Sequence, residues 1–252
     1  INCIFDSALP NVVVADCELE KTKLQTSLSG VDFSNGEHII STEDHPYFVK
    51  TKGWSIEDQK YWLSFRIGKT MLTKYNVKAI DYFNMAKDDN GLHKSLQVGS
   101  KCCYGYFDKN GEVYKIYQPH SKKHKFHKVK NYIQGIDQLE YNQPYLVICS
   151  SLKDAMCLKG MGYNIEVICP DSENTMIKPH IIFNLKQKYK KIITLFDNDD
   201  AGVKAVQRYT ETYKIHGCVP TMSKDISDAM KNHGFDKVHS MLKPLLKETL
   251  NK

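Results

Sequence analysis

The stretch IITLFDNDDAG, residues 192–202, changes from an apolar run to a group of acids and then to two small residues. The apolar run is too short for a helix and rich in β-branched residues, so it predicts a buried strand. Asp197 and Asp199 follow at its carboxyl end, where extended backbone would point both side chains the same way. Paired carboxylates suit Mg²⁺ or Mn²⁺. Ligands of open α/β sheets also usually bind at this end of the strands.

A simpler interpretation of the same acids remains open. They could start a loop and favour the positive N-terminal end of the helix that the pattern predicts from Ala201 onward. Other segments of the chain have to decide between the two interpretations.

Length and composition are those of an ordinary globular protein. The chain has 252 residues, of which 25% are charged and 41% hydrophobic, and no apolar run approaches the roughly 20 residues that cross a membrane. Its eight cysteines include no CxxC spacing, so a zinc site is not expected. Because the sequence begins with Ile1, we expect it to be a piece of a longer protein.

Positive charge is concentrated in one window of the sequence. The net charge is only +6, yet no acid occurs between Glu112 and Asp137. Aromatic residues such as Tyr117 and Phe126 alternate with basic ones there, which is typical of surfaces that bind a phosphate backbone and unstacked bases. A solvated basic face is the competing interpretation. The lysines of this basic window are Lys115, Lys122, Lys123, Lys125, Lys128 and Lys130.

The order of predicted elements divides the chain. A capping-box pattern at Ser55 starts a helix, and Asn110-Gly111 between two aromatic-rich runs predicts a hairpin. Beyond residue 140, strands alternate with helices, which predicts a parallel sheet. The expected fold class is therefore α/β. We expect three parts in the chain: a mixed α+β basic lobe over residues 1–140, an α/β domain over 141–234 and a C-terminal helix over 235–252. Within the first part, residues 1–50 are poorly assigned.

Three segments of the α/β part fall at the ends of predicted strands, namely ICSSLKDA at 148–155, FDNDDAG at 196–202 and KDISD at 224–228. Together they resemble the TOPRIM domain of bacterial-type and phage DNA primases. In that family a first strand ends in Glu, with Asp four residues later, and these positions fall on Ser150 and Asp154 in ICSSLKDA. A later strand ends in Asp-x-Asp-x-x-Gly, which Asp197, Asp199 and Gly202 match in full. A third acidic pair corresponds to Asp225 and Asp228 in KDISD. The resemblance covers residues 145–234, and residues 54–119 look less sharply like the basic N-terminal lobe of phage primase cores.

The resemblance implies an α/β domain that uses Mg²⁺ or Mn²⁺ to make RNA primers on a single-stranded DNA template. Its implied metal ligands are Asp197, Asp199, Asp225 and Asp228, and its implied catalytic acids include Asp154. Nucleic acid or NTP would contact the basic window, Lys153 and Lys224. The family also implies a replicative helicase or another replisome component as partner, no membrane, and the cytoplasm of a bacterial host. A zinc ribbon often precedes such cores and is not expected in this chain.

Ser150 departs from the family pattern, because a hydroxyl cannot act as a carboxylate at neutral pH. Glu173, after the second parallel strand, could supply the missing acid, or it could simply cap the next helix. Two other functions stay open, the first because TOPRIM domains also occur in nucleases and the second because of Ser150. One is a TOPRIM metal-dependent nuclease, and the other is a silent single-stranded-DNA-binding replication module.

Overall fold

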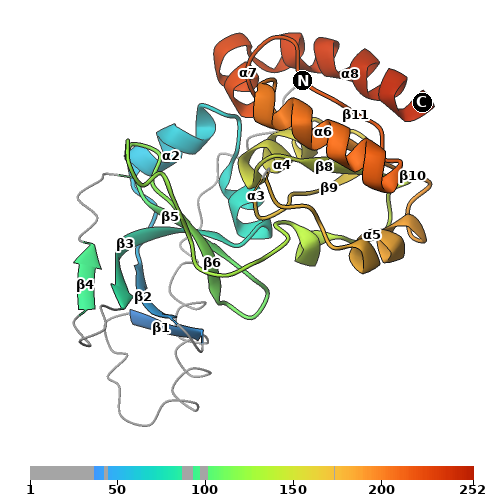
Figure 1. The fold of residues 1–252 in the computed structure, drawn as a ribbon. Coiled ribbons are helices and arrows are strands. Elements are labelled where there is room, and N and C mark those ends of the chain that lie inside the picture. Colours follow the sequence, from blue (N-terminus) through green and yellow to red (C-terminus); the bar gives the residue numbers. More distant parts are fainter. Residues whose placement is uncertain (1–36, 43–44, 87–92, 97–101, 173) are drawn as a thin grey trace. The chain divides into compact units, whose positions relative to one another are not determined.

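The computed structural model describes residues 37–42, 45–86, 93–96, 102–172 and 174–252 (Figure 1). These residues form two compact units. The first unit takes the described residues up to Lys60 and those within 76–130, whereas the second takes residues 61–75 and the described residues within 131–252. Glu173 lies outside the described residues.

The first unit is built on an antiparallel sheet of seven strands. Its strand order is β1-β2-β3-β5-β6-β7, with β4 paired to β3. Buried apolar side chains such as Val49, Ile80, Phe83 and Ile116 form its core. The strands are β1 (Glu37–Thr42), β2 (His45–Thr51), β3 (Val77–Ala86), β4 (His93–Leu96), β5 (Tyr104–Phe107), β6 (Val113–Tyr117) and β7 (Phe126–Lys128).

Two local predictions in this part of the chain are confirmed. The Ser55 hydroxyl accepts a hydrogen bond from the Asp58 N–H at 3.1 Å, and Asp58 Oδ2 accepts from the Ser55 N–H at 3.0 Å. This reciprocal pair is a capping box at the start of α2 (Ile56–Leu63). The expected hairpin is formed by β5 and β6, and Gly111 in its turn has φ +82°, a conformation that favours glycine.

The second unit contains a four-stranded parallel sheet in the order β11-β10-β8-β9. The strands are β8 (Tyr145–Cys149), β9 (Ile165–Ile168), β10 (Lys191–Leu195) and β11 (Gly217–Cys218). The helices of this unit are α3 (Lys69–Lys74), α4 (Leu152–Lys159), α5 (Pro179–Lys186), α6 (Asp200–Tyr213), α7 (Ile226–His233) and α8 (Phe235–Asn251), and a short 3₁₀ helix η1 covers Ile136–Gln138. The structure thus confirms an α/β protein with an antiparallel sheet followed by a parallel one.

Helices cover both faces of the parallel sheet. Leu146 and Ile148 of β8 pack in one core with Leu185 of α5 and Tyr209 of α6, so α5 and α6 share a face. Helices α4 and α8 contact the strands too, and α7 contacts both of these helices. No helix in the described ranges is both long and apolar enough to span a membrane.

Residues 61–75 join the second unit although they precede half of the first unit in sequence. Phe65 is buried, its carbonyl accepts a hydrogen bond from the Cys157 thiol, and the Lys153 ammonium lies 4.3 Å from its ring centroid. The observed division therefore differs from the single predicted boundary at residue 140. The reason is that these contacts join residues about 90 positions apart, and no local pattern reports them.

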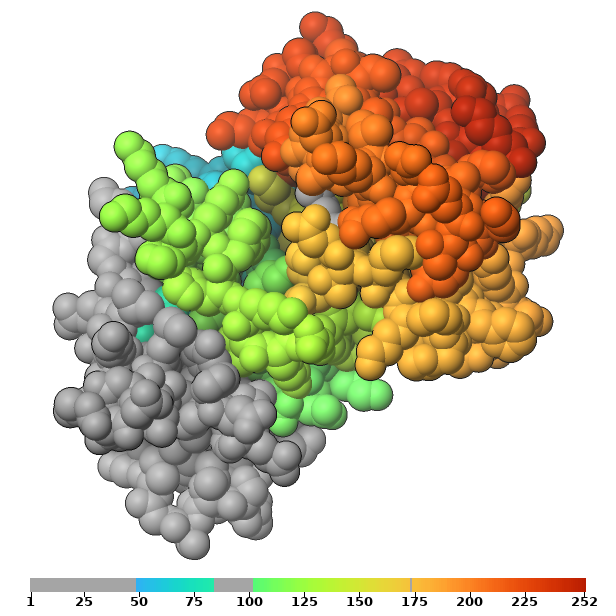
Figure 2. Space-filling model, in the orientation of Figure 1, coloured from blue at the N-terminus to red at the C-terminus, as the bar shows by residue number. Residues whose placement is uncertain are grey.

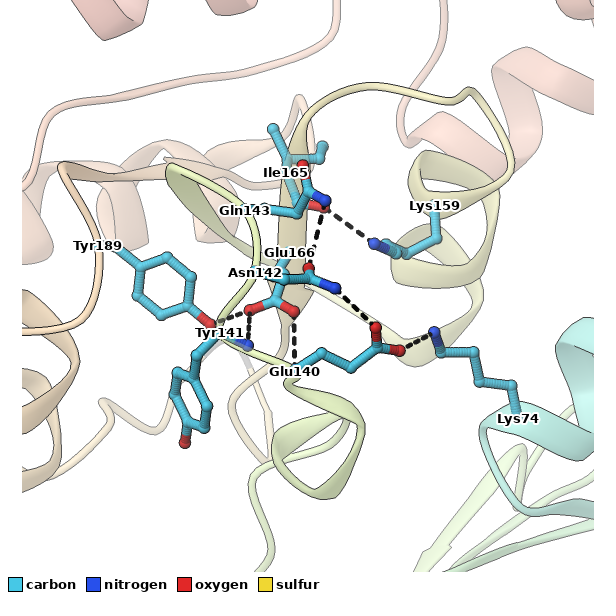
Figure 3. A network of polar contacts seen from close by, with 9 residues as sticks. All are labelled: Lys74, Glu140, Tyr141, Asn142, Gln143, Lys159, Ile165, Glu166 and Tyr189. Atoms are coloured by element: carbon cyan, nitrogen blue, oxygen red, sulfur yellow. Dashed lines mark hydrogen bonds and ion pairs between the residues drawn. The ribbon is translucent and has the colours of Figure 1, made fainter.

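A buried carboxylate fixes the loop that leads into β8. Glu166 on β9 accepts hydrogen bonds from the backbone N–H groups of Glu140 and Tyr141 at 2.8 and 3.1 Å and from the Tyr189 hydroxyl (Figure 3). Burial and the Glu166 charge raise the pKa of Tyr189. Glu140 in turn pairs with Lys74 at 2.6 Å. The network holds the entry to β8, the strand that ends at the candidate site.

Candidate active site

The acidic turn, residues 197–199, leaves the carboxyl end of β10 and enters α6. Asp199 is the N-cap of α6, and its Oδ1 accepts the Gly202 N–H at 2.9 Å. That bond, together with the neighbouring Lys224 ammonium, lowers the pKa of Asp199. The turn is so tight that a Cβ on Gly202 would lie 2.1 Å from the Asp197 carbonyl oxygen. The glycine is therefore required by close approach of the backbone.

Ser150 connects this turn to the neighbouring strand. It follows β8 directly, and its hydroxyl oxygen accepts the Asp197 N–H at 2.9 Å. The position where the family resemblance places a Glu therefore braces the end of β8 against the acidic turn. A hydroxyl in this place orients Asp197 but supplies no negative charge.

Lys224 brings the third predicted segment to the same place. Its ammonium lies 2.9 Å from Asp199 Oδ2 and 3.8 Å from Asp197 Oδ2. Its backbone carbonyl accepts the Asn198 N–H at 2.6 Å, which ties the start of α7 to the acidic turn. One cation thus reaches both carboxylates of the Asp-x-Asp motif, so the two side chains converge as the sequence predicts.

Asp154 has a different environment from the other predicted acids. It is only 3% exposed, its Oδ2 accepts the Ser151 hydroxyl at 2.5 Å, and its Oδ1 accepts the Ser227 N–H at 2.9 Å. Burial, reinforced by the charge of Asp225, raises the pKa of Asp154 to about 6. In this arrangement Asp154 joins the N-terminal ends of α4 and α7, and both of its oxygens are engaged by the protein.

Asp225 and Asp228 lie at the start of α7. Asp225 is the N-cap, and its Oδ1 accepts the Asp228 N–H at 2.6 Å and the Ser227 hydroxyl at 2.8 Å. Both acids are partly exposed. A helix-capping role is thus demonstrated for Asp225, and metal binding by either acid stays a prediction.

The donor chemistry of the acidic turn fits a divalent cation. The Lys224 ammonium shows that a positive centre can reach oxygens of Asp197 and Asp199 together. Among the described residues, no three His, Cys, Asp or Glu side chains form a group that could hold a metal. Two carboxylates nevertheless suffice for Mg²⁺ when water and substrate phosphates complete the coordination.

The basic window lies in the first unit, where the structure separates its residues into different environments. Lys122, Lys123, Lys125 and Lys128 are exposed. Lys130 instead lies 2.6 Å from Asp108 and 2.5 Å from Glu112 in a partly buried cluster. Lys115 lies 5.8 Å from the Phe126 ring centroid. In Figure 2 the residues of this part of the first unit are drawn in green, and they lie at the visible surface.

The aromatic residues of the window differ as strongly as its lysines. Tyr114 and Tyr117 are buried, with 1% and 2% exposure, whereas Phe126 is 49% exposed. Alternation along the sequence did not predict this difference. It arises because β6 lies inside the sheet and β7 lies at its edge.

Comparison with known proteins identifies the domain that carries the acids. Residues 147–232 match the family model described as Toprim-like. These residues form a Toprim-like domain. They span β8 to α7 and include Ser150, Asp154, the acidic turn and Asp225. The comparison with curated proteins found no match.

Solved structures show that the likeness extends beyond the Toprim-like domain. The Aquifex aeolicus primase, with its zinc-binding and RNA polymerase domains, is 15% identical with a TM-score of 0.54. That match covers 78% of this chain and 56% of the other, so the chain spans little more than half of that primase structure. The DnaG catalytic core is 12% identical with a TM-score of 0.56, covering 77% of this chain and 74% of that one. The chain therefore has a primase-like Toprim catalytic-core fold.

Proposed function

We propose that this chain is the catalytic core of a phage DNA primase, which synthesises short RNA primers on single-stranded DNA by metal-dependent nucleotidyl transfer. The observation that carries the proposal is the convergence of Asp197 and Asp199 on one cation at the end of β10. This convergence lies inside a Toprim-like domain of a primase-like fold. A replicative helicase or another replisome component would be its partner.

The residues divide the chemistry as follows. Asp197 and Asp199 would hold Mg²⁺ or Mn²⁺, and Asp225 would assist. The metal would supply Lewis acidity toward the triphosphate and lower the pKa of the attacking 3′-hydroxyl. The protein's own task is mainly to position groups and stabilise charge, since phosphoryl transfer needs little covalent help. The Ser150 hydroxyl would keep Asp197 in place by accepting the backbone N–H of Asp197.

Template binding would fall to the basic window. The exposed lysines Lys122, Lys123, Lys125 and Lys128 would contact the phosphates, and the exposed ring of Phe126 would contact a base. Lys115 would join them beside that ring. Lys130 would stabilise this surface through its ion pairs with Asp108 and Glu112.

The missing family Glu leaves a second candidate function. Ser150 carries no charge, so the domain could be a silent single-stranded-DNA-binding module of a replication complex. We favour Glu173 as the replacement acid, because it follows the strand β9 that pairs with β8. Full activity of Glu173→Gln beside an inactive Asp199→Asn would rule out that assignment.

The deciding test is primer synthesis on mixed-sequence single-stranded DNA with four NTPs and Mg²⁺ or Mn²⁺. We expect short RNA from the wild type and a loss of at least about 100-fold in Asp199→Asn, because a metal ligand is removed. Asp200→Asn is the matched control, since it removes the same charge from an exposed neighbouring residue. A second tube with a pre-annealed primer bypasses initiation. No product in either tube would reject the proposal, and loss of the DNA strand would indicate a nuclease instead.

A further inference from the structure

The ion pairs of Lys224 place a positive charge where the proposed metal would be needed. The ammonium lies 2.9 Å from Asp199 Oδ2 and 3.8 Å from Asp197 Oδ2. These are two of the oxygens that a divalent cation would require. An ammonium and a divalent cation that share these oxygens repel each other, so binding of one disfavours the other.

The backbone of Lys224 is fixed, whereas its side chain is accessible. The Asn198 N–H bonds to its carbonyl, and the next residue, Asp225, caps α7. The side chain is nevertheless 57% exposed. A long, flexible stem on a fixed backbone allows the ammonium to leave the acids without any movement of the fold.

The destination of a displaced ammonium follows from the same geometry. Its backbone remains bonded to the acidic turn, so the charge stays within a side-chain length of Asp197 and Asp199. A nucleoside triphosphate bound through a metal on these acids would bring several negative oxygens to this place. Lysine is well suited to meet such a group as a mobile point charge.

We propose that Lys224 is a built-in counter-ion of the Asp-x-Asp pair, which a divalent cation displaces and which then contacts the triphosphate of the incoming nucleotide. The inference rests on the proposed function, and it adds an order of events in which metal binding comes before the contact of Lys224 with the substrate. Without metal, Lys224 neutralises the acids and stabilises the empty turn. With metal, the same charge becomes available to the substrate.

The first experiment measures metal binding without nucleotide or DNA, by titrating the full chain with Mn²⁺ and recording the free ion by electron paramagnetic resonance. Lys224→Met should bind Mn²⁺ about two- to fivefold more tightly, because an exposed ion pair no longer competes. Lys204→Met is the matched control, since this exposed lysine of α6 gives the same change in net charge. Lys224→Arg should bind Mn²⁺ about as weakly as the wild type.

The second experiment measures the KM for NTP during extension of a pre-annealed primer. Lys224→Met should raise it about tenfold, as expected when a charge-assisted contact to phosphate is lost, and Lys204→Met should leave it unchanged. Mn²⁺ binding by Lys224→Met that equals or is weaker than that of Lys204→Met would overturn the counter-ion inference. An unchanged KM would overturn the substrate contact.

Failure of the proposed function gives a different result. If Asp199→Asn binds Mn²⁺ as well as the wild type, or if no variant binds it, the acids hold no metal before the nucleotide arrives and the counter-ion inference is rejected, whereas the proposed function is rejected only by the absence of primer synthesis. If Mn²⁺ binds and Lys224→Met tightens it but no primer is extended, the counter-ion inference is upheld and polymerisation alone is rejected.

Discussion

The ring of Phe126 stacks on the ring of Tyr117, with 4.7 Å between the ring centroids and 14° between the planes. Tyr117 is buried and Phe126 is half exposed, so a rigid core residue supports an aromatic ring at the surface. Lys115 lies beside the exposed ring. Proteins that bind single-stranded nucleic acid combine such groups, because bases stack on the aromatic ring and the positive charge attracts the phosphates.

Phe126→Leu should therefore weaken binding of single-stranded DNA by about fivefold or more, because a stacked base loses its partner. Fluorescence anisotropy with a labelled oligonucleotide measures the Kd. Phe183→Leu is the control, since Phe183 on α5 is also exposed, at 64%. Equal effects of the two substitutions would show that Phe126 does not contact a base.

Three neighbouring exposed lysines should set much of the salt dependence of DNA binding. Replacing Lys122, Lys123 and Lys125 together by alanine should reduce the slope of log Kobs against log salt concentration by about 2, since each lost phosphate contact removes roughly 0.7 on a single strand. The control is alanine at three exposed lysines of α8, Lys237, Lys243 and Lys247. If the control changes the slope equally, the effect reflects net charge and not the basic window.

Asp154 should make stability fall as the pH rises. Its pKa in the folded chain is about 6, above the usual value of 3.8, so the folded state holds a proton that the unfolded state has lost between these values. The contribution of Asp154 to stability is therefore complete below about pH 4, declines up to about pH 6 and is constant above. The total change is about 3 kcal/mol.

Asp154→Asn should remove this dependence, because an amide does not titrate in this range. The substitution also keeps an oxygen that can accept the Ser227 N–H. Urea denaturation at several pH values between 4.5 and 7.5, without divalent metal, measures it. The free energy of unfolding of wild type relative to Asp154→Asn should decrease across the range and level off above pH 6.5. Parallel curves for the two proteins would contradict the prediction.

Glu166→Gln should lower the free energy of unfolding by about 1.5–3 kcal/mol, as expected for hydrogen bonds to a buried charged group. A glutamine keeps one acceptor oxygen but turns an amide toward an N–H donor or the Tyr189 hydroxyl. Glu140→Gln is the control in the same network, because its ion pair with Lys74 is exposed and should contribute little (Figure 3). Chemical denaturation of the two variants should separate them clearly.

The sequence predicted those features that depend on local pattern. The apolar runs at 145–149, 165–169 and 192–196 correspond closely to β8, β9 and β10, because short buried strands between turns have a distinct signature. The Asp-x-Asp spacing also predicted that Asp197 and Asp199 face one place. Both inferences needed only the period of the strand and its end.

Other features depend on contacts between distant segments. Asp154 follows Lys153 on a helix and looks like a surface acid, yet the start of α7 buries it. Lys224 pairs with the acidic turn, which lies about 25 positions earlier in the sequence, because the Asn198 bond brings its backbone to the turn. The metal and catalytic roles of these residues stay predictions.

The return of residues 61–75 to the second unit has a consequence for how the protein is made. During synthesis Phe65 is added about 90 residues before Cys157 and well over 100 residues before Lys231. Both of these residues contact Phe65 in the folded structure. Until then the nascent chain must carry this apolar segment while the sheet around β5 and β6 can already assemble. Completion of the domain that holds the acids is thereby postponed to the last part of synthesis, and a chain that stops early leaves Phe65 as a target for chaperones and proteases.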